Sequence, residues 1–111
     1  MEHETRIVEG WTEALTYQLF DEEPGLDPVI ANLTGKTVTL TIAGCEGSLI
    51  DTVGKVVVID AINGKVAFTP ITTDFKAIKS PYRARFTAVY LTTIVFYPNK
   101  DTFKIIVDPV V

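Results

Sequence analysis

The chain has 111 residues, enough for one domain around a single hydrophobic core. Apolar residues make up 47% of the composition and charged residues 22%, which indicates a globular rather than a disordered protein. The longest uncharged stretch, residues 86–99, is shorter than the ~20 apolar residues of a membrane helix, so no membrane partner is expected.

Charge is distributed unevenly along the sequence. Residues 1–30 hold eight acids and one base, a balance of −7, whereas residues 31–111 hold six acids and nine bases, a balance of +3. This split favours head-to-tail contact between copies, because an acidic patch on one copy can meet a basic patch on the next. Ordinary solvated charges are the alternative. The bases are scattered singly, so nucleic acid is not an expected partner.

The first segment, residues 1–8, is predicted to be a tail, and residues 9–111 a single domain. The chain starts with acidic and polar residues, unlike the basic and then apolar start of an export signal. Residues 6–20 contain one long strand or two shorter ones, and residues 21–28 interrupt that pattern with a Pro-Gly turn.

Strict alternation marks the next strand, residues 36–43. Val38, Leu40 and Ile42 share the core side, as in an antiparallel sheet with one solvated face. The opposite side carries Thr37, Thr39 and Thr41. Residues 48–52 are expected to form a short edge strand.

Asn63-Gly64 predicts a β-hairpin between residues 55–61 and residues 65–69. A two-residue type I′ turn needs positive φ at both central positions, which Asn-Gly tolerates best. The substitution Gly64→Val is therefore expected to cost about 1 kcal/mol or more.

Residues 72–79 are the one helical candidate, a turn or two long. A threonine can cap the first turn, and Phe75 and Ile78 stand three residues apart on one face. Pro81 prevents continuation and pushes Ser80 towards extended geometry.

Residues 82–90 alternate apolar residues with Arg83 and Arg85, which places the arginines on the outer face of a strand. The chain must then reverse near residues 90–92, although no glycine, asparagine or proline is present there to form the turn. The remaining strand, turn and last strand are predicted at residues 93–97, 98–101 and 102–107.

Short strands with turn signals every 8 to 12 residues predict an all-β fold, an immunoglobulin-like β-sandwich of about seven to eight antiparallel strands with one short helix. Cys45 is the only cysteine, so no intrachain disulfide forms and the core must hold by packing. The Cys…Trp…Cys hallmark of antibody domains is absent.

Five segments occur in a characteristic order: Glu9-Gly10-Trp11-Thr12, Leu33-Thr34-Gly35-Lys36-Thr37-Val38, Asn63-Gly64-Lys65-Val66-Ala67-Phe68-Thr69, Tyr82-Arg83-Ala84 and Tyr97-Pro98-Asn99-Lys100-Asp101-Thr102-Phe103-Lys104-Ile105. Through them the chain resembles the immunoglobulin-like N-terminal domain of the baseplate upper protein of tailed bacteriophages and related small virion proteins. Two departures are Ser80-Pro81, where the family commonly has a glycine before tyrosine, and residues 90–92, where a polar Asp-Gly tip is usual.

The resemblance implies a non-enzymatic structural protein of the virion, assembled in the host cytoplasm. Such a module docks an appendage in the baseplate, tail or neck, in several copies, so the expected partners are other virion proteins and copies of the chain itself. A head-decoration protein is an alternative within the same class.

The apolar loop Tyr90-Leu91-Thr92 is the predicted contact site, because buried apolar anchors carry most of the affinity of an interface. Charged outer faces set selectivity, which adds Arg83 and Arg85. Trp11 is the further residue of the predicted interface.

No catalytic residue, cofactor or metal ligand is predicted. A hydrolase triad needs a base beside its nucleophile, and the only histidine, His3, falls in the predicted tail. Cys45 is likewise expected to be inert without a base or cation near it. The acids of residues 21–27 leave calcium open, but their spacing lacks the oxygen pattern of a calcium loop, and a solvated acidic turn is the alternative.

A carbohydrate-binding module is the second hypothesis, because β-sandwiches often display aromatic residues. Tyr17, Tyr82 and Tyr90 fall on positions predicted to face the core, where an aromatic ring more often packs than binds a ligand. Trp11 and Tyr97 are the exceptions that remain for sugar contact.

Overall fold

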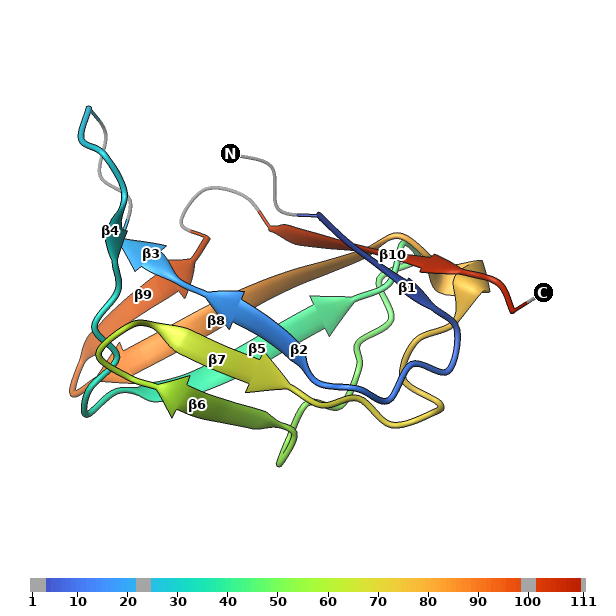
Figure 1. Ribbon diagram of the computed structural model, residues 1–111, viewed down its shortest axis with the longest axis horizontal. Coiled ribbons are helices and arrows are strands. Elements are labelled where there is room, and N and C mark those ends of the chain that lie inside the picture. The colour runs from blue at the N-terminus through green and yellow to red at the C-terminus, as the bar shows by residue number, and fades with distance from the viewer. Residues whose placement is uncertain (1–3, 22–24, 99–101, 111) are drawn as a thin grey trace.

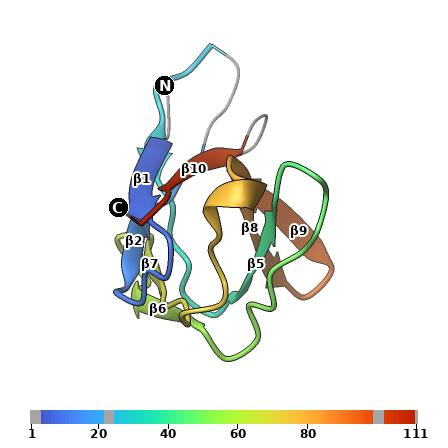
Figure 2. The same ribbon diagram turned by 90° about the vertical axis from the view of Figure 1, so that its right-hand side faces the viewer.

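The computed structural model describes residues 4–21, 25–98 and 102–110, which form two facing β-sheets (Figure 1). The larger sheet contains β1 (Glu4–Val8), β5 (Thr37–Ala43), β8 (Tyr82–Tyr90), β9 (Thr93–Tyr97) and β10 (Phe103–Asp108). The smaller sheet contains β2 (Leu15–Gln18), β6 (Val56–Asp60) and β7 (Lys65–Phe68). Figure 2 shows the two layers edge on. The predicted all-β sandwich is confirmed.

Strand β8 is the central strand of the larger sheet. One of its edges pairs antiparallel with β5 along the whole of that strand. Its other edge is shared, with β10 beside residues 82–84 and β9 beside residues 86–90. Both edges of β8 are therefore occupied by neighbouring strands.

Strand β1 pairs in parallel with β10, with Glu4 beside Lys104 and Val8 beside Asp108. The tail predicted over residues 1–8 is wrong for residues 4–8, which form an edge strand; the strand predicted from residue 6 onwards covers part of it. The larger sheet is mixed, whereas only antiparallel strands were predicted. No hairpin joins these two strands, so nothing in the local chain forces them to run antiparallel.

The hydrophobic core lies between the two sheets and is rich in aromatic rings. The Tyr17 ring centroid lies 4.8 Å from that of Phe103 and 5.5 Å from that of Phe86, while Phe75 meets Tyr82 edge to face at 5.1 Å. Each such pair contributes about 0.5–1.5 kcal/mol beyond its burial. Other buried core residues are Ile7, Leu15, Leu19, Leu33, Leu40, Ile42, Val66, Phe68, Tyr97, Ile105 and Val107.

The predicted hairpin of residues 55–61 and 65–69 is confirmed as β6 and β7, but its turn type is wrong. Residues 61–64 form the connection, in which the Gly64 N–H donates to the Ala61 carbonyl at 3.2 Å. Of the two residues expected at positive φ, only Gly64 has it (+64°). A Cβ at Gly64 would meet the Ala31 carbonyl oxygen at 2.7 Å, so tertiary packing sets this turn.

The helix predicted at residues 72–79 and the edge strand predicted at residues 48–52 are both wrong in extent. The helical candidate shrinks to a 3-10 turn, η1 (Ala77–Lys79), and Ile78 points into solvent while Phe75 is fully buried. The predicted edge strand of residues 48–52 amounts to one bridge between Leu49 and Ala43. Ser80 is extended, as the following proline predicts. Of the turn predicted at residues 98–101, all but Pro98 lies outside the described residues.

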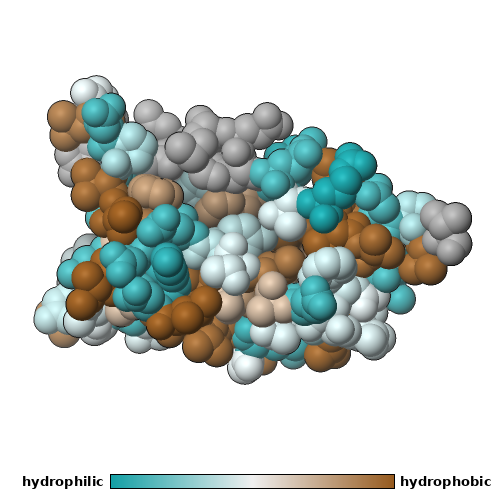
Figure 3. Space-filling model, in the orientation of Figure 1, coloured by the Kyte–Doolittle hydropathy of each residue, from teal (hydrophilic) through white to brown (hydrophobic). Residues whose placement is uncertain are grey.

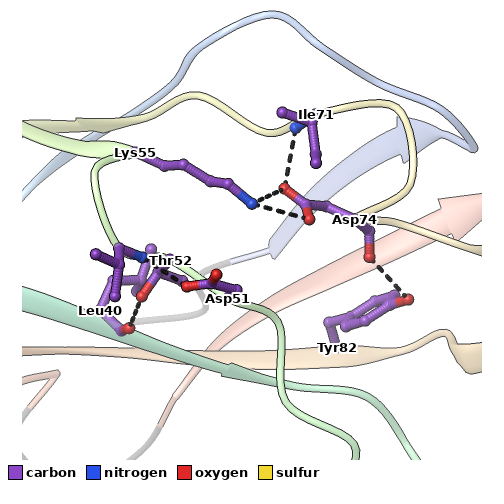
Figure 4. A network of polar contacts seen from close by, with 8 residues as sticks. Leu40, Asp51, Thr52, Lys55, Ile71, Asp74 and Tyr82 are labelled. Atoms are coloured by element: carbon purple, nitrogen blue, oxygen red, sulfur yellow. Dashed lines mark hydrogen bonds and ion pairs between the residues drawn. The ribbon is translucent and has the colours of Figure 1, made fainter.

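A polar network supports the crossover from β7 to β8 (Figure 4). Lys55 donates to both carboxylate oxygens of Asp74, at 3.1 and 2.9 Å, and this ion pair is largely buried. The Ile71 N–H donates to the same carboxylate at 2.9 Å, and the Tyr82 hydroxyl accepts the Lys76 N–H at 3.0 Å. A buried charge pair is favourable only when its polar atoms are satisfied, as they are for Asp74.

A two-stranded ribbon projects beyond one end of the sandwich (Figure 1). It consists of β3 (Phe20–Asp21) and β4 (Val29–Ile30), which pair antiparallel. We call β3, β4 and residues 25–28 the arm. The sequence predicted only a turn over residues 21–28.

Glycine 64 offers a test of this packing. Gly64→Ala should lower the free energy of unfolding by about 2–4 kcal/mol, because the new methyl group meets two backbone oxygens and the residue keeps a positive φ. Gly47→Ala is the matched control, since Gly47 also has positive φ but open space around it, and it should cost only about 1 kcal/mol. Equal losses in urea denaturation would contradict the packing explanation.

Candidate functional site

The tip of the β8–β9 hairpin is the most exposed apolar point of the larger sheet. Leu91 has a positive φ of 55° and 82% of its surface is exposed, and Tyr90 and Thr92 are exposed beside it. The positive φ of Leu91 lets the chain reverse here without a glycine, although such a backbone conformation is rare for a bulky residue. The Tyr90 ring lies over Gly35, where an added Cβ would be 3.7 Å from its Cε2 atom.

The apolar surface continues from this tip along β9. Ile94 lies beside Val89 and Phe96 beside Thr87, with both β9 side chains on the outer face and exposed. Phe96 is absent from the predicted interface, although alternation within residues 93–97 places it opposite the buried Tyr97.

A shallow groove of about 290 Å³ opens on the outer face of the larger sheet. The Arg85 guanidinium lies 5.4 Å from the centre of the Phe96 ring, within the range of a cation–π contact. The groove is lined by Thr41, Ala43, Arg83, Arg85, Thr87, Phe96 and Thr102. Threonine methyl groups, the aromatic ring and the arginine stems make its surface mainly apolar, with positive charge at its side.

One groove residue, Arg83, stands directly opposite a second cation that does not line the groove. Arg83 on β8 pairs in register with Lys104 on β10, and like charges facing across a sheet are destabilising. The Glu4 Oε1 atom lies 3.9 Å from Lys104 Nζ, so the Glu4 carboxylate partly compensates the charge of Lys104. Arg83 forms no ion pair with the other described residues, so its charge is open to an external anion.

The structure brings together some of the predicted interface residues. Tyr90, Leu91 and Thr92 form the hairpin tip, whereas Arg83 and Arg85 lie towards the other end of the same strand. Trp11 lies apart from both groups, in the loop after β1, where it packs partly against the core with its indole N–H buried and unbonded.

The two sugar-contact candidates do not form a binding platform. Tyr97 is 1% exposed, because its position on β9 faces Phe86 in the core, and its hydroxyl donates to the Asp21 carboxylate at 2.9 Å. Tyr97 therefore packs inside the sandwich instead of presenting a ring to a ligand. Trp11 alone keeps a partly exposed ring.

The described residues contain no cluster of three or more potential metal ligands. Asp21 and Asp27 line a second cavity of about 400 Å³ with Leu26 and Val29, while Glu22 and Glu23 lie outside the described residues. Cys45 is exposed. Among the described helices, none has the length and apolar character needed to cross a membrane.

Comparison with known proteins adds no relative: no family model matches the sequence, and no curated protein matches it significantly. The likeness to phage virion proteins therefore stays a prediction.

Tyr97 gives the fold a pH dependence that can be measured. Burial, followed by the hydrogen bond to Asp21, raises the pKa of Tyr97 above its ordinary value of about 10. Because the folded-state pKa is the higher one, its stabilising contribution is complete below about pH 10 and is lost as the pH rises further. Tyr97→Phe should remove part of the alkaline loss of stability.

At neutral pH the same variant should lose about 1.5–3 kcal/mol of its free energy of unfolding, the typical contribution of one hydrogen bond to a charged group. Tyr90→Phe, at an exposed tyrosine, should leave the free energy of unfolding unchanged at neutral pH. Urea denaturation from about pH 7 to about pH 11 measures both effects. An alkaline slope identical to that of the wild type would exclude this role for Tyr97.

Proposed function

We propose that this chain is a non-enzymatic structural module of a tailed-phage virion, which docks a partner protein through the tip of the β8–β9 hairpin. One observation carries the proposal: Leu91 is a bulky apolar residue that is both held at positive φ and exposed. Strained exposed residues of this kind concentrate at binding and switch sites.

The energetics of Leu91 favour a bound state. A left-handed backbone conformation costs a non-glycine residue roughly 1–2 kcal/mol, and the exposed side chain offers no burial to offset that cost in the free chain. Full burial of a leucine side chain under a partner contributes about 1.5–3 kcal/mol. Contact with a partner therefore offsets the strain that folding alone leaves in place.

The neighbouring residues favour the same role. The Tyr90 ring is placed over the Gly35 turn, and the β8–β9 pairing continues to the Tyr90–Thr93 pair, so the tip is preorganised. Preorganised anchors lose less entropy on binding. Ile94 and Phe96 extend the apolar surface away from the tip.

The resemblance of the turn and strand segments to those of baseplate proteins favours a place in the baseplate, tail or neck, with other virion proteins as partners. The sandwich is compatible with that assignment, because its interior is filled by side chains and leaves recognition to loops and outer faces. Several copies per particle, assembled in the host cytoplasm, belong to the same proposal.

Substitutions at Leu91 separate docking from folding. Leu91→Asp should reduce the number of copies found in purified particles about tenfold or more, because a charge replaces a central apolar anchor. Leu91→Gly should also reduce the copy number, while raising the free energy of unfolding by roughly 0.5–1 kcal/mol through relief of the positive φ. Quantitative mass spectrometry of particles and urea denaturation provide the two measurements.

Ile78→Asp is the matched control, because Ile78 is an apolar residue of similar exposure on η1, away from the hairpin. It should leave the copy number unchanged. Wild-type copy numbers for Leu91→Asp would overturn the assignment of the hairpin, and absence of the wild-type chain from particles would overturn the virion function.

A further inference from the structure

We propose that the arm of one copy docks in the arginine-lined groove of a second copy, so that copies join head to tail. The inference deepens the proposed function, on which it rests for the expectation of several copies. It names a contact between copies that is separate from the β8–β9 hairpin tip.

The arm carries apolar side chains that its own chain does not cover. Leu26 is 66% exposed and Val29 65% exposed, with Ile30 also exposed next to them. Figure 3 shows apolar residues gathered over this projection. A two-stranded ribbon is only marginally stable by itself, and exposed apolar patches mark interaction sites.

The base of the arm is held firmly to the sandwich. The Ala31 N–H donates to the Leu19 carbonyl at 2.9 Å, and the Leu19 N–H donates to the Gly64 carbonyl at 2.8 Å. The hydroxyl of buried Tyr97 donates to Asp21 at the start of the arm. The arm is therefore oriented by the body of the molecule, which lowers the entropic cost of docking it.

The groove offers the complementary chemistry. Arg83 lines the groove and forms no ion pair with the other described residues, so an anion in the groove can pair with its guanidinium. Phe96 and the threonine methyl groups provide an apolar floor beside these charges. The arm combines the matching features, because Asp27 accompanies its three exposed apolar residues.

The two surfaces occupy different parts of the molecule. The arm leaves the end of the sandwich, whereas the groove lies on the outer face of the larger sheet, the layer of β5, β8 and β9 in Figure 2. A contact between unlike surfaces is heterologous, so it repeats from copy to copy and produces either a closed ring or an open chain. The negative balance of residues 1–30 and the positive balance of residues 31–111 also favour contact between unlike surfaces of two copies.

Sedimentation velocity of the full chain over a wide range of concentration tests the contact. The mean mass of the wild type should rise with concentration and fall with added salt, because the charged contact is screened. Arg83→Glu and Asp27→Lys should each weaken association about tenfold or more, and the double variant with both changes should recover it. Lys65→Glu, on the smaller sheet, is the matched control and should associate like the wild type.

Mixing the two single variants adds a sharper result. Arg83→Glu retains an intact arm and Asp27→Lys an intact groove, and the reversed arm of the second variant matches the reversed groove of the first. Each variant alone should therefore associate weakly, whereas the equimolar mixture should recover the association of the wild type. A wild type that stays monomeric at every concentration, or association that ignores both charge reversals, would overturn the head-to-tail contact. Neither result affects the Leu91 assay in particles, so the two proposals fail separately.

Discussion

The alternation of strand β8 is the constraint on which the rest of the structure depends. Its inward side chains, including Tyr82 and Phe86, join the aromatic core, and its outward side chains include Arg83 and Arg85. Both edges are hydrogen-bonded to other strands, so β8 places β5, β9 and β10 at once. A slip of one residue would turn the arginines into the core and expose the aromatic rings, which makes its register strongly specified.

This one strand also separates two kinds of surface. At its C-terminal end the chain reverses through Leu91, and the result is an apolar projection under backbone strain. Towards its N-terminal end, Arg83 is held beside Lys104, and the result is a concentration of positive charge. An apolar anchor contributes affinity, whereas charges govern selectivity and encounter rate, so the two ends are suited to different contacts.

Sequence reasoning succeeded where the determinants are local. Alternation within residues 36–43 and 82–90 identified the buried and solvated faces, and the lack of turn residues at 90–92 drew attention to the strained tip. It failed where distant segments decide, as in the parallel pairing of β1 with β10, the arm, and the turn at Gly64 set by Ala31. The opposition of Arg83 and Lys104 likewise depends on a register between strands that no local pattern reveals.

The parallel pairing of β1 with β10 has a mechanical consequence. Because these strands run in the same direction, a tension applied at Glu4 and Asp108 pulls them in opposite senses along their common axis. All the hydrogen bonds between them are then loaded together in shear, instead of opening one after another as in an unzipping hairpin. The parallel pairing of β1 with β10 is therefore suited to resist a force applied along these two strands.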